Sequence, residues 1–255
     1  MVLVNEPIVA SVTPQLHKSL VVVGMPAHNE EKTIARVVLA AQRNAHIVIV
    51  CDDGSSDLTG MIAEQLGAVV IRHQANRGYG AALRSLFERA RLLRADVFIT
   101  LDADGQHDPS QIPLLVKPIE DGVAEVVLGS RFIDKNGTAD MPLYRKIGIE
   151  VITKLINGLS KNCISDAQSG FRAYGRKALE NLSVNENGMS ASIELLGTLD
   201  KNNFRVSEVP ISCTYHITAG DDKSAVEPIA RGFGLLMFIL RRIFKKTLGR
   251  SGIWT

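Results

Sequence analysis

Features of secreted, disulfide-bonded and membrane-spanning proteins are scarce in this chain of 255 residues. Its three cysteines, Cys51, Cys163 and Cys213, are widely spaced and odd in number, which favours free thiols in a reducing compartment over disulfides or a zinc site. Residues 1–18 lack a basic start followed by an apolar run, so we expect a polar N-terminal extension instead of a signal peptide. The longest apolar run near the end, residues 232–240, is shorter than the roughly 20 residues that span a bilayer.

The charge of the chain is also nearly balanced. A formal net charge of +2 gives no reason to expect nucleic acid as a partner. Charged residues make up 22% and hydrophobic residues 45% of the chain, which is typical of a folded globular protein. The length allows one large core, or one core with a small appendage.

Short apolar runs recur through the first 130 residues. They occupy residues 20–24, 47–51, 68–72, 96–101 and 125–128, and each is apolar almost throughout, as in a strand covered on both faces of a parallel sheet. Apolar residues at helical spacing lie between them, for example Ile34, Val37, Val38 and Ala41. This alternation predicts an α/β fold with a doubly wound, mostly parallel sheet, which binds ligands at the carboxyl ends of its strands.

The pattern changes after Arg131. We expect a polar loop at 134–140, a helix at 143–159, a compact polar turn at 166–175, a helix at 191–199, an edge strand at 205–210 and a helix at 228–248. No internal repeat or low-complexity linker divides the chain. One continuous domain is therefore the simplest organisation.

Two carboxylates one residue apart follow the fourth apolar run, in Leu101-Asp102-Ala103-Asp104-Gly105-Gln106-His107. On a turn that leaves a buried strand, such a pair can bind one hard cation. Magnesium or manganese prefers carboxylate oxygens and leaves positions open for phosphate oxygens. A lone Asp-x-Asp is more often a solvated acidic turn, but here other polar turns also follow strands.

Three further turns carry polar residues at strand ends. In Met25-Pro26-Ala27-His28-Asn29-Glu30-Glu31 we expect Pro26 to end the strand and Asn29 to cap the next helix. In Cys51-Asp52-Asp53-Gly54-Ser55-Ser56-Asp57 the carboxylates can accept hydrogen bonds from a base and a ribose, and in Asn76-Arg77-Gly78-Tyr79-Gly80 the arginine can approach phosphates. For each turn, a routine capped strand-to-helix connection is the alternative.

The order of these motifs resembles the family 2 inverting glycosyltransferases of GT-A fold. It reads Pro-Ala-His-Asn-Glu, Asp-Asp-Gly-Ser-Ser-Asp, Asn-Arg-Gly-Tyr-Gly, Asp-Ala-Asp-Gly-Gln-His and Gly-Ser-Arg-Phe, and the similarity is strongest from about residue 20 to 172. Within the family the chain is most similar to dolichyl-phosphate mannose and glucose synthases. The resemblance implies transfer of a hexose or N-acetylhexosamine, with inversion, from a GDP- or UDP-sugar to dolichyl or another polyprenyl phosphate in a membrane.

For the donor side, the resemblance implies that Asp104 is the principal ligand of Mg²⁺ or Mn²⁺, with Asp102 and Gln106 completing the metal and diphosphate site. The residues that it places around the nucleotide sugar are Pro26, His28, Glu30, Asp52, Asp53, Arg77 and Ala103.

For the acceptor side, the resemblance implies that Arg131 and Arg145 hold the acceptor phosphate, and Lys223 loosely matches a further phosphate ligand. Asp166, in Asp166-Ala167-Gln168-Ser169-Gly170-Phe171-Arg172, would lie near the reacting sugar. It is also the candidate base if the acceptor is a hydroxyl group.

The resemblance divides the chain into an N-terminal extension (1–18), a GT-A domain (19–225) and a C-terminal segment (226–255). The domain would have a donor half (19–131) and an acceptor half (132–225). In the C-terminal segment apolar and basic residues gather on different sides of a helix, which indicates peripheral binding to anionic lipid on the cytoplasmic face of a membrane. A packed core helix, a homodimer contact or a contact with a membrane protein are the alternatives.

Other functions of an α/β fold stay open at this point. A transferase of the same fold could act on a saccharide hydroxyl. A nucleotide-sugar pyrophosphorylase would need a glycine-rich loop with Arg and Lys after the first strand, and Pro26-Ala27-His28-Asn29-Glu30 is not such a loop. Fold alone does not distinguish an enzyme from a binding module.

Overall fold

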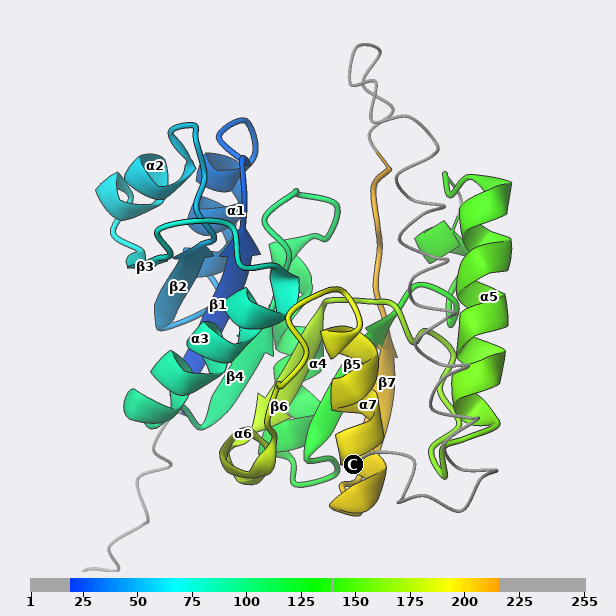
Figure 1. Ribbon diagram of the computed structural model, residues 1–255. Helices are drawn as coiled ribbons and strands as arrows, with labels where there is room; N and C mark the ends of the chain where they lie inside the picture. The colour runs from blue at the N-terminus through cyan, green and yellow to red at the C-terminus, as the bar shows by residue number, and fades with distance from the viewer. Residues whose placement is uncertain (1–18, 139, 216–255) are drawn as a thin grey trace, which may run out of the picture.

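The computed structural model describes residues 19–138 and 140–215 of the chain (Figure 1). The expected N-terminal extension, Lys223 and the expected helix at 228–248 lie outside these residues.

A seven-stranded sheet crosses the molecule in the order β3-β2-β1-β4-β6-β5-β7. The strands are β1 (Val21–Ala27), β2 (Ile47–Asp52), β3 (Val69–Arg72), β4 (Val97–Thr100), β5 (Val126–Ser130), β6 (Arg172–Gly175) and β7 (Val206–Pro210). All neighbours are parallel except β6, which is antiparallel to both β4 and β5. The chain leaves β1 toward β2 and β3 and then returns to β4 on the other side, so the switch point of the sheet lies between β1 and β4.

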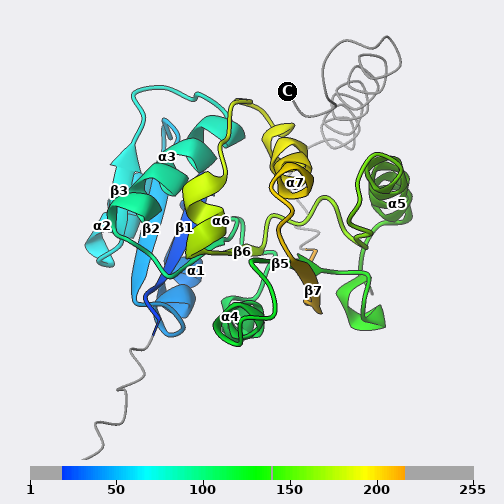
Figure 2. The same ribbon diagram turned by 90° about the horizontal axis from the view of Figure 1, so that it is seen from below.

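Helices cover both faces of the sheet (Figure 2). They are α1 (Ile34–Gln42), α2 (Thr59–Gln65), α3 (Tyr79–Leu92), α4 (Ile112–Glu120), α5 (Leu143–Asn157), α6 (Arg176–Asn181) and α7 (Ala191–Lys201), with short 3-10 turns at Pro109–Gln111 and Lys135–Thr138. One apolar core joins α3, α5, α6 and α7 to the sheet, and a second joins α1, α2 and α4 to it. The predicted doubly wound, mostly parallel α/β fold is therefore confirmed.

The strands and helices expected within the described residues occur within a few residues of their predicted places, but β6 was missed. The sequence predicted a compact polar turn over 166–175, whereas Arg172–Gly175 is a fully buried strand. Its first residue explains the error: the Arg172 guanidinium is buried and donates to the carbonyl oxygens of Ser169 and Ala167 at 2.8 and 3.0 Å. A charged side chain that is satisfied by backbone carbonyls looks like a solvent-exposed residue in the sequence.

Two expectations for the turn after β1 were wrong. Pro26 does not end the strand; β1 continues through it to Ala27, and Pro26 pairs with Cys51 of β2. Pairing with β4 stops at Gly24, so beyond that point β1 has a neighbour on one side only, where a residue without an N–H is tolerated. Asn29 does not cap α1, whose N-cap is Thr33; its side chain instead accepts a 2.8 Å hydrogen bond from Ser56 N.

Candidate active site

The loops after β1 and β2 form one connected unit at the carboxyl edge of the sheet. His28 Nδ1 lies 3.0 Å from the carbonyl oxygen of Asp53, and Glu30 N donates to Thr59 Oγ1 at 2.7 Å. His28 is exposed, while Pro26 and Glu30 are half-buried. The structure thus brings the predicted nucleotide-binding turns together.

Asp52 and Asp53 are both buried, but their side chains face different partners. Asp52 Oδ1 accepts from Ser55 N at 3.0 Å within its own turn. Asp53 accepts from Arg77 N at 3.0 Å and from Gly78 N at 2.8 Å, while its Oδ1 also lies 2.6 Å from His73 Nδ1. Asp53 therefore organises the 76–78 turn, from which the Arg77 side chain projects into solvent.

The Asp-x-Asp turn follows β4, beside the switch point. Tyr79 Oη donates to Asp102 Oδ1 at 3.4 Å, and any side chain at Gly170 would collide with the Asp102 carboxylate. Asp104 Oδ1 accepts from Gln106 N at 2.9 Å, and Ala103 is buried between the two carboxylates. Burial and then the nearby charge of Asp104 raise the pKa of Asp102 to about 7.

The chemistry of this turn fits a hard divalent cation. Asp102, Asp104 and Gln106 offer carboxylate and amide oxygens, and a cation would offset the repulsion that raises the pKa of Asp102. Within 19–138 and 140–215, no three His, Cys, Asp or Glu side chains converge as a closed metal site. Mg²⁺ in nucleotide sites is usually held by one or two carboxylates together with phosphate oxygens and water, so a turn with two carboxylates is enough to fit it.

Arg131 and Asp166, which the sequence assigned to separate roles, form a buried ion pair. Arg131 is 3% exposed, and its Nε and Nη2 donate to Asp166 Oδ2 and Oδ1 at 2.6 and 2.8 Å. Burial alone would raise the pKa of Asp166, but the hydrogen bonds and charge of Arg131 lower it below its ordinary value. Asp166 is therefore a weak proton acceptor.

Tyr215 joins the two arginines predicted to hold the acceptor phosphate. Arg131 Nη1 donates to Tyr215 Oη at 3.3 Å, and Arg145 Cζ lies 4.9 Å from the centre of the Tyr215 ring. Arg145 Nη2 also lies 3.4 Å from Gln106 Oε1 of the Asp-x-Asp turn. Sequence reasoning missed Tyr215 because it belongs to none of the recognised motifs, and only the path of the chain beyond β7 brings it here.

A backbone contact holds the segment after β7 against the Asp-x-Asp turn. Thr214 N donates to the carbonyl oxygen of Gln106 at 2.8 Å, and His107 forms a single antiparallel bridge with Cys213. This contact places Tyr215, the next residue of that segment, beside the predicted metal ligands.

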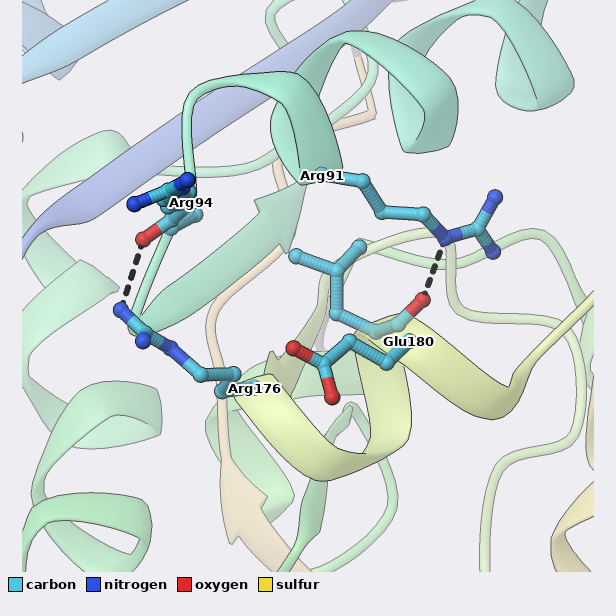
Figure 3. A pocket seen from close by; sticks show the side chains of 6 residues that line it. Arg91, Arg94, Arg176 and Glu180 are labelled. Carbon is cyan, nitrogen blue, oxygen red and sulfur yellow. Dashed lines mark hydrogen bonds between the residues drawn. The ribbon is translucent and has the colours of Figure 1, made fainter.

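A separate pocket of about 230 Å³ lies away from this edge (Figure 3). It is lined by Arg91, Arg94, Arg176 and Glu180 among others, where α3 ends and β4 is about to begin. Arg91 Nε donates to the Leu179 carbonyl oxygen at 2.7 Å, and Arg176 Nη2 donates to that of Arg94 at 2.8 Å. The pocket is smaller than the roughly 300 Å³ of ordinary ligand sites, and Glu180 offsets part of its positive charge. It lies at the amino ends of the strands, so it is not the donor site.

The region that contains these motifs also matches a known protein family. The sequence signature described as "Glycosyl transferase family 2" matches residues 22–183, more than half of the chain. The chain is a family 2 glycosyltransferase. The match covers the loops after β1, β2, β4 and β5 that were described above.

Several relatives of this glycosyltransferase extend the similarity beyond that region. An uncharacterized protein of Methanocaldococcus jannaschii is 33% identical over 237 residues, covering 90% of this chain and 95% of its own. The UDP-N-acetylglucosamine–dolichyl-phosphate N-acetylglucosaminyltransferase of Methanococcus voltae is 35% identical, covering 75% and 84%. The polyprenol monophosphomannose synthase of Mycolicibacterium smegmatis is 31% identical, covering 80% of each chain.

Solved structures confirm the GT-A-like fold of the glycosyltransferase. Glucosyl-3-phosphoglycerate synthase of Mycobacterium tuberculosis superposes with a TM-score of 0.66 at 22% identity, covering 88% of this chain and 79% of its own. The same enzyme with Mn²⁺, UDP and glucosyl-3-phosphoglycerate gives a TM-score of 0.63 at 21% identity, covering 87% and 78%. At this identity the likeness shows the fold alone.

Proposed function

We propose that this glycosyltransferase moves a sugar from a UDP- or GDP-sugar to dolichyl or another polyprenyl phosphate, with inversion and with Mg²⁺ or Mn²⁺ at Asp102, Asp104 and Gln106. The names of the Methanococcus voltae and Mycolicibacterium smegmatis relatives support the lipid-phosphate acceptor. The complex of glucosyl-3-phosphoglycerate synthase with Mn²⁺ and UDP is consistent with the donor and the metal.

One observation supports the choice of a lipid acceptor: α5 carries both Arg145, the predicted phosphate ligand, and an exposed apolar face. Arg145 lies in its first turn, beside Gln106. Leu143, Tyr144, Ile147 and Val151 on the same helix are 71%, 50%, 52% and 47% exposed. Contiguous apolar side chains on a surface mark an interaction site. A lipid whose phosphate meets Arg145 would lay its first isoprene units, or the bilayer surface, against this face.

A phosphate acceptor also suits the charges of the site. Its oxygen is already anionic near neutral pH, so no strong base has to deprotonate it. Charge-assisted hydrogen bonds from Arg145 and from Nη1 of Arg131, the nitrogen that does not bind Asp166, can hold the acceptor phosphate. Arg145 packs on the Tyr215 ring, which restricts its side chain. The weak basicity of Asp166 is compatible with this reaction and unfavourable for a hydroxyl acceptor. The bound cation would supply Lewis-acid stabilisation of the leaving diphosphate.

The same proposal covers the organisation of the chain. Residues 19–131 would bind the donor and residues 132–225 the acceptor. The C-terminal segment 226–255, with Lys223 before it, would hold the protein peripherally at anionic lipid on the cytoplasmic face. Among 19–138 and 140–215, no helix is long and apolar enough to cross a membrane.

Arg145 gives a clean test, because its side chain is half-buried and, within residues 19–138 and 140–215, forms no buried ion pair like that of Arg131. We expect Arg145→Ala to keep UDP or GDP binding within about threefold while single-turnover transfer of labelled sugar to polyprenyl phosphate falls roughly 30- to 1000-fold. Arg145→Lys should recover part of the rate, since it keeps the charge and loses the planar fork. Lys146→Ala, on the next residue of α5, is the matched control and should change little.

The product and the binding data separate the alternatives. Labelled sugar that extracts into organic solvent with the lipid supports the lipid-phosphate acceptor. Transfer only to a saccharide would favour the hydroxyl-acceptor alternative. If Arg145→Ala lost nucleotide binding instead, Arg145 would belong to the donor diphosphate.

A further inference from the structure

His73 lies at the end of β3, outside every motif that pointed to the function, and is almost completely buried. Its Nδ1 lies 2.6 Å from Asp53 Oδ1, and the side chains of this pair are 5% and 6% exposed. On the other side of the ring, Nε2 lies 2.9 Å from Ser85 Oγ of α3. With Nδ1–H donating to the carboxylate and the serine hydroxyl donating to Nε2, a neutral ring satisfies both contacts.

Asp53, which contacts His73, also binds the backbone of the 76–78 turn. Both carboxylate oxygens of Asp53 accept from the 76–78 turn, one from Arg77 N and the other from Gly78 N. Gly78 is the N-cap of α3 with φ of +97°, and a Cβ there would lie 2.5 Å from the Asn187 carbonyl oxygen. The 76–78 turn is thus tightly confined. The rotation of the Asp53 carboxylate determines the positions of the Arg77 and Gly78 amides, which donate to it. The contact with His73 fixes that rotation.

The turn leads directly to the proposed donor site. Arg77 projects from it, and the next helical residue, Tyr79, donates to Asp102 Oδ1 of the Asp-x-Asp turn. A continuous series of contacts therefore runs from His73 through Asp53 and the 76–78 backbone to a predicted metal ligand. None of these contacts involves the acceptor-side residues.

We propose that His73 is a positioning residue for the donor: through Asp53 it fixes the 76–78 turn, and with it Arg77 and Tyr79, in the geometry that binds the nucleoside diphosphate. This inference rests on the donor site of the proposed function. It does not depend on the identity of the acceptor. It also changes the role expected of Asp53: instead of contacting the nucleotide sugar, Asp53 would position the 76–78 turn.

Two amide variants separate the contacts of His73. In His73→Asn the amide nitrogen takes roughly the place of Nδ1 and can still donate to Asp53. In His73→Gln it reaches roughly the place of Nε2, so the bond to Asp53 is lost. Ser85→Ala is the matched control, because it removes the hydroxyl 2.9 Å from His73 Nε2 and keeps the contact of Nδ1 with Asp53.

The measurement is binding of UDP and of GDP, each with Mn²⁺, by calorimetry on the full chain, with thermal unfolding recorded in parallel. We expect His73→Gln to weaken binding of the nucleotide that the parent prefers by about tenfold or more. His73→Asn and Ser85→Ala should stay within about threefold of the parent. In steady-state assays the KM for the donor should rise in His73→Gln, while the KM for the acceptor stays unchanged.

Equal losses of binding in His73→Asn and His73→Gln, in proportion to their loss of thermal stability, would overturn the proposal in favour of a purely structural role. Unchanged binding in His73→Gln would overturn it as well. A parent protein that binds nucleotide but transfers no sugar to polyprenyl phosphate would refute the proposed acceptor and leave the role of His73 standing.

Discussion

Arg131 shows how burial changes the role of a single residue. A guanidinium that is 3% exposed and bound through two nitrogens to Asp166 has little freedom to follow a ligand. Removing one partner of such a pair leaves an uncompensated buried charge and typically costs about 3–5 kcal/mol of folding stability. Loss of activity in an Arg131 variant would therefore combine lost stability with lost catalysis.

At Asp104 we predict metal dependence. Excess EDTA should abolish transfer, Mg²⁺ or Mn²⁺ should restore it, and Asp104→Asn should reduce the rate at least about 100-fold and far more than Asp102→Asn. The physical reason is that the diphosphate and the two carboxylates are all anionic and need a cation between them. The measurement is initial rate in chelated buffer and in a metal titration. Full turnover in excess EDTA would exclude the metal site.

At His107 we predict a pH-dependent loss of stability. The ring is buried, its Nδ1 has no hydrogen-bond partner in the described part of the chain, and burial lowers its pKa from 6.5 to about 4. Below pH 6.5 the unfolded chain binds a proton that the folded ring refuses until about pH 4, so stability is complete above pH 6.5 and is lost as pH falls. Between pH 7 and 4.5 this group should cost roughly 2 kcal/mol.

Denaturant titrations at pH 7 and pH 4.5 measure that loss. In His107→Gln the difference between the two pH values should shrink by roughly 2 kcal/mol relative to the parent. An identical difference in both proteins would mean that other groups cause the acid sensitivity.

Among the elements, α5 carries the clearest prediction. If its exposed apolar face meets the bilayer, Ile147→Asn/Val151→Asn should weaken binding to liposomes of anionic lipid and polyprenyl phosphate at least about tenfold, because less apolar area leaves water. Leu92→Asn/Val123→Asn is the matched control: these residues are 76% and 60% exposed, and neither belongs to α5. Equal binding of all three proteins in a sedimentation assay would exclude α5 as the lipid contact.

The elements also show what the sequence could predict. Parallel strands covered on both faces have a continuous apolar run, so β2 and β4 were predicted almost to the residue. β6 was not predicted because it is four residues long and begins with Arg172, whose charge is satisfied only in the folded chain. A hydropathy pattern cannot represent partners that lie far away in sequence.

At the scale of the whole molecule, the site likewise contains turns that a local pattern predicts and contacts between distant segments that it does not. The turns with Asp52, Asp102 and Arg131 were found because each directly follows a recognisable strand, and parallel strands end at one edge. The links between turns were not found: Arg131 with Asp166, Arg145 with Tyr215, and His73 with Asp53. Each link joins segments that no local pattern relates, so only the folded chain shows it.

Because β6 lies between β4 and β5 in the sheet, the time at which the sheet can form during synthesis depends on a strand that is made late. Thr100 of β4 pairs with Arg172, and Val97 pairs with Gly175. A ribosome adding about 5 to 20 residues per second needs roughly 4 to 15 seconds to produce the intervening stretch. During that time one edge of β4 has no partner, so the growing chain carries an open, apolar strand edge until β6 emerges. The first half of this enzyme therefore cannot finish folding during translation before the second half has supplied its strand.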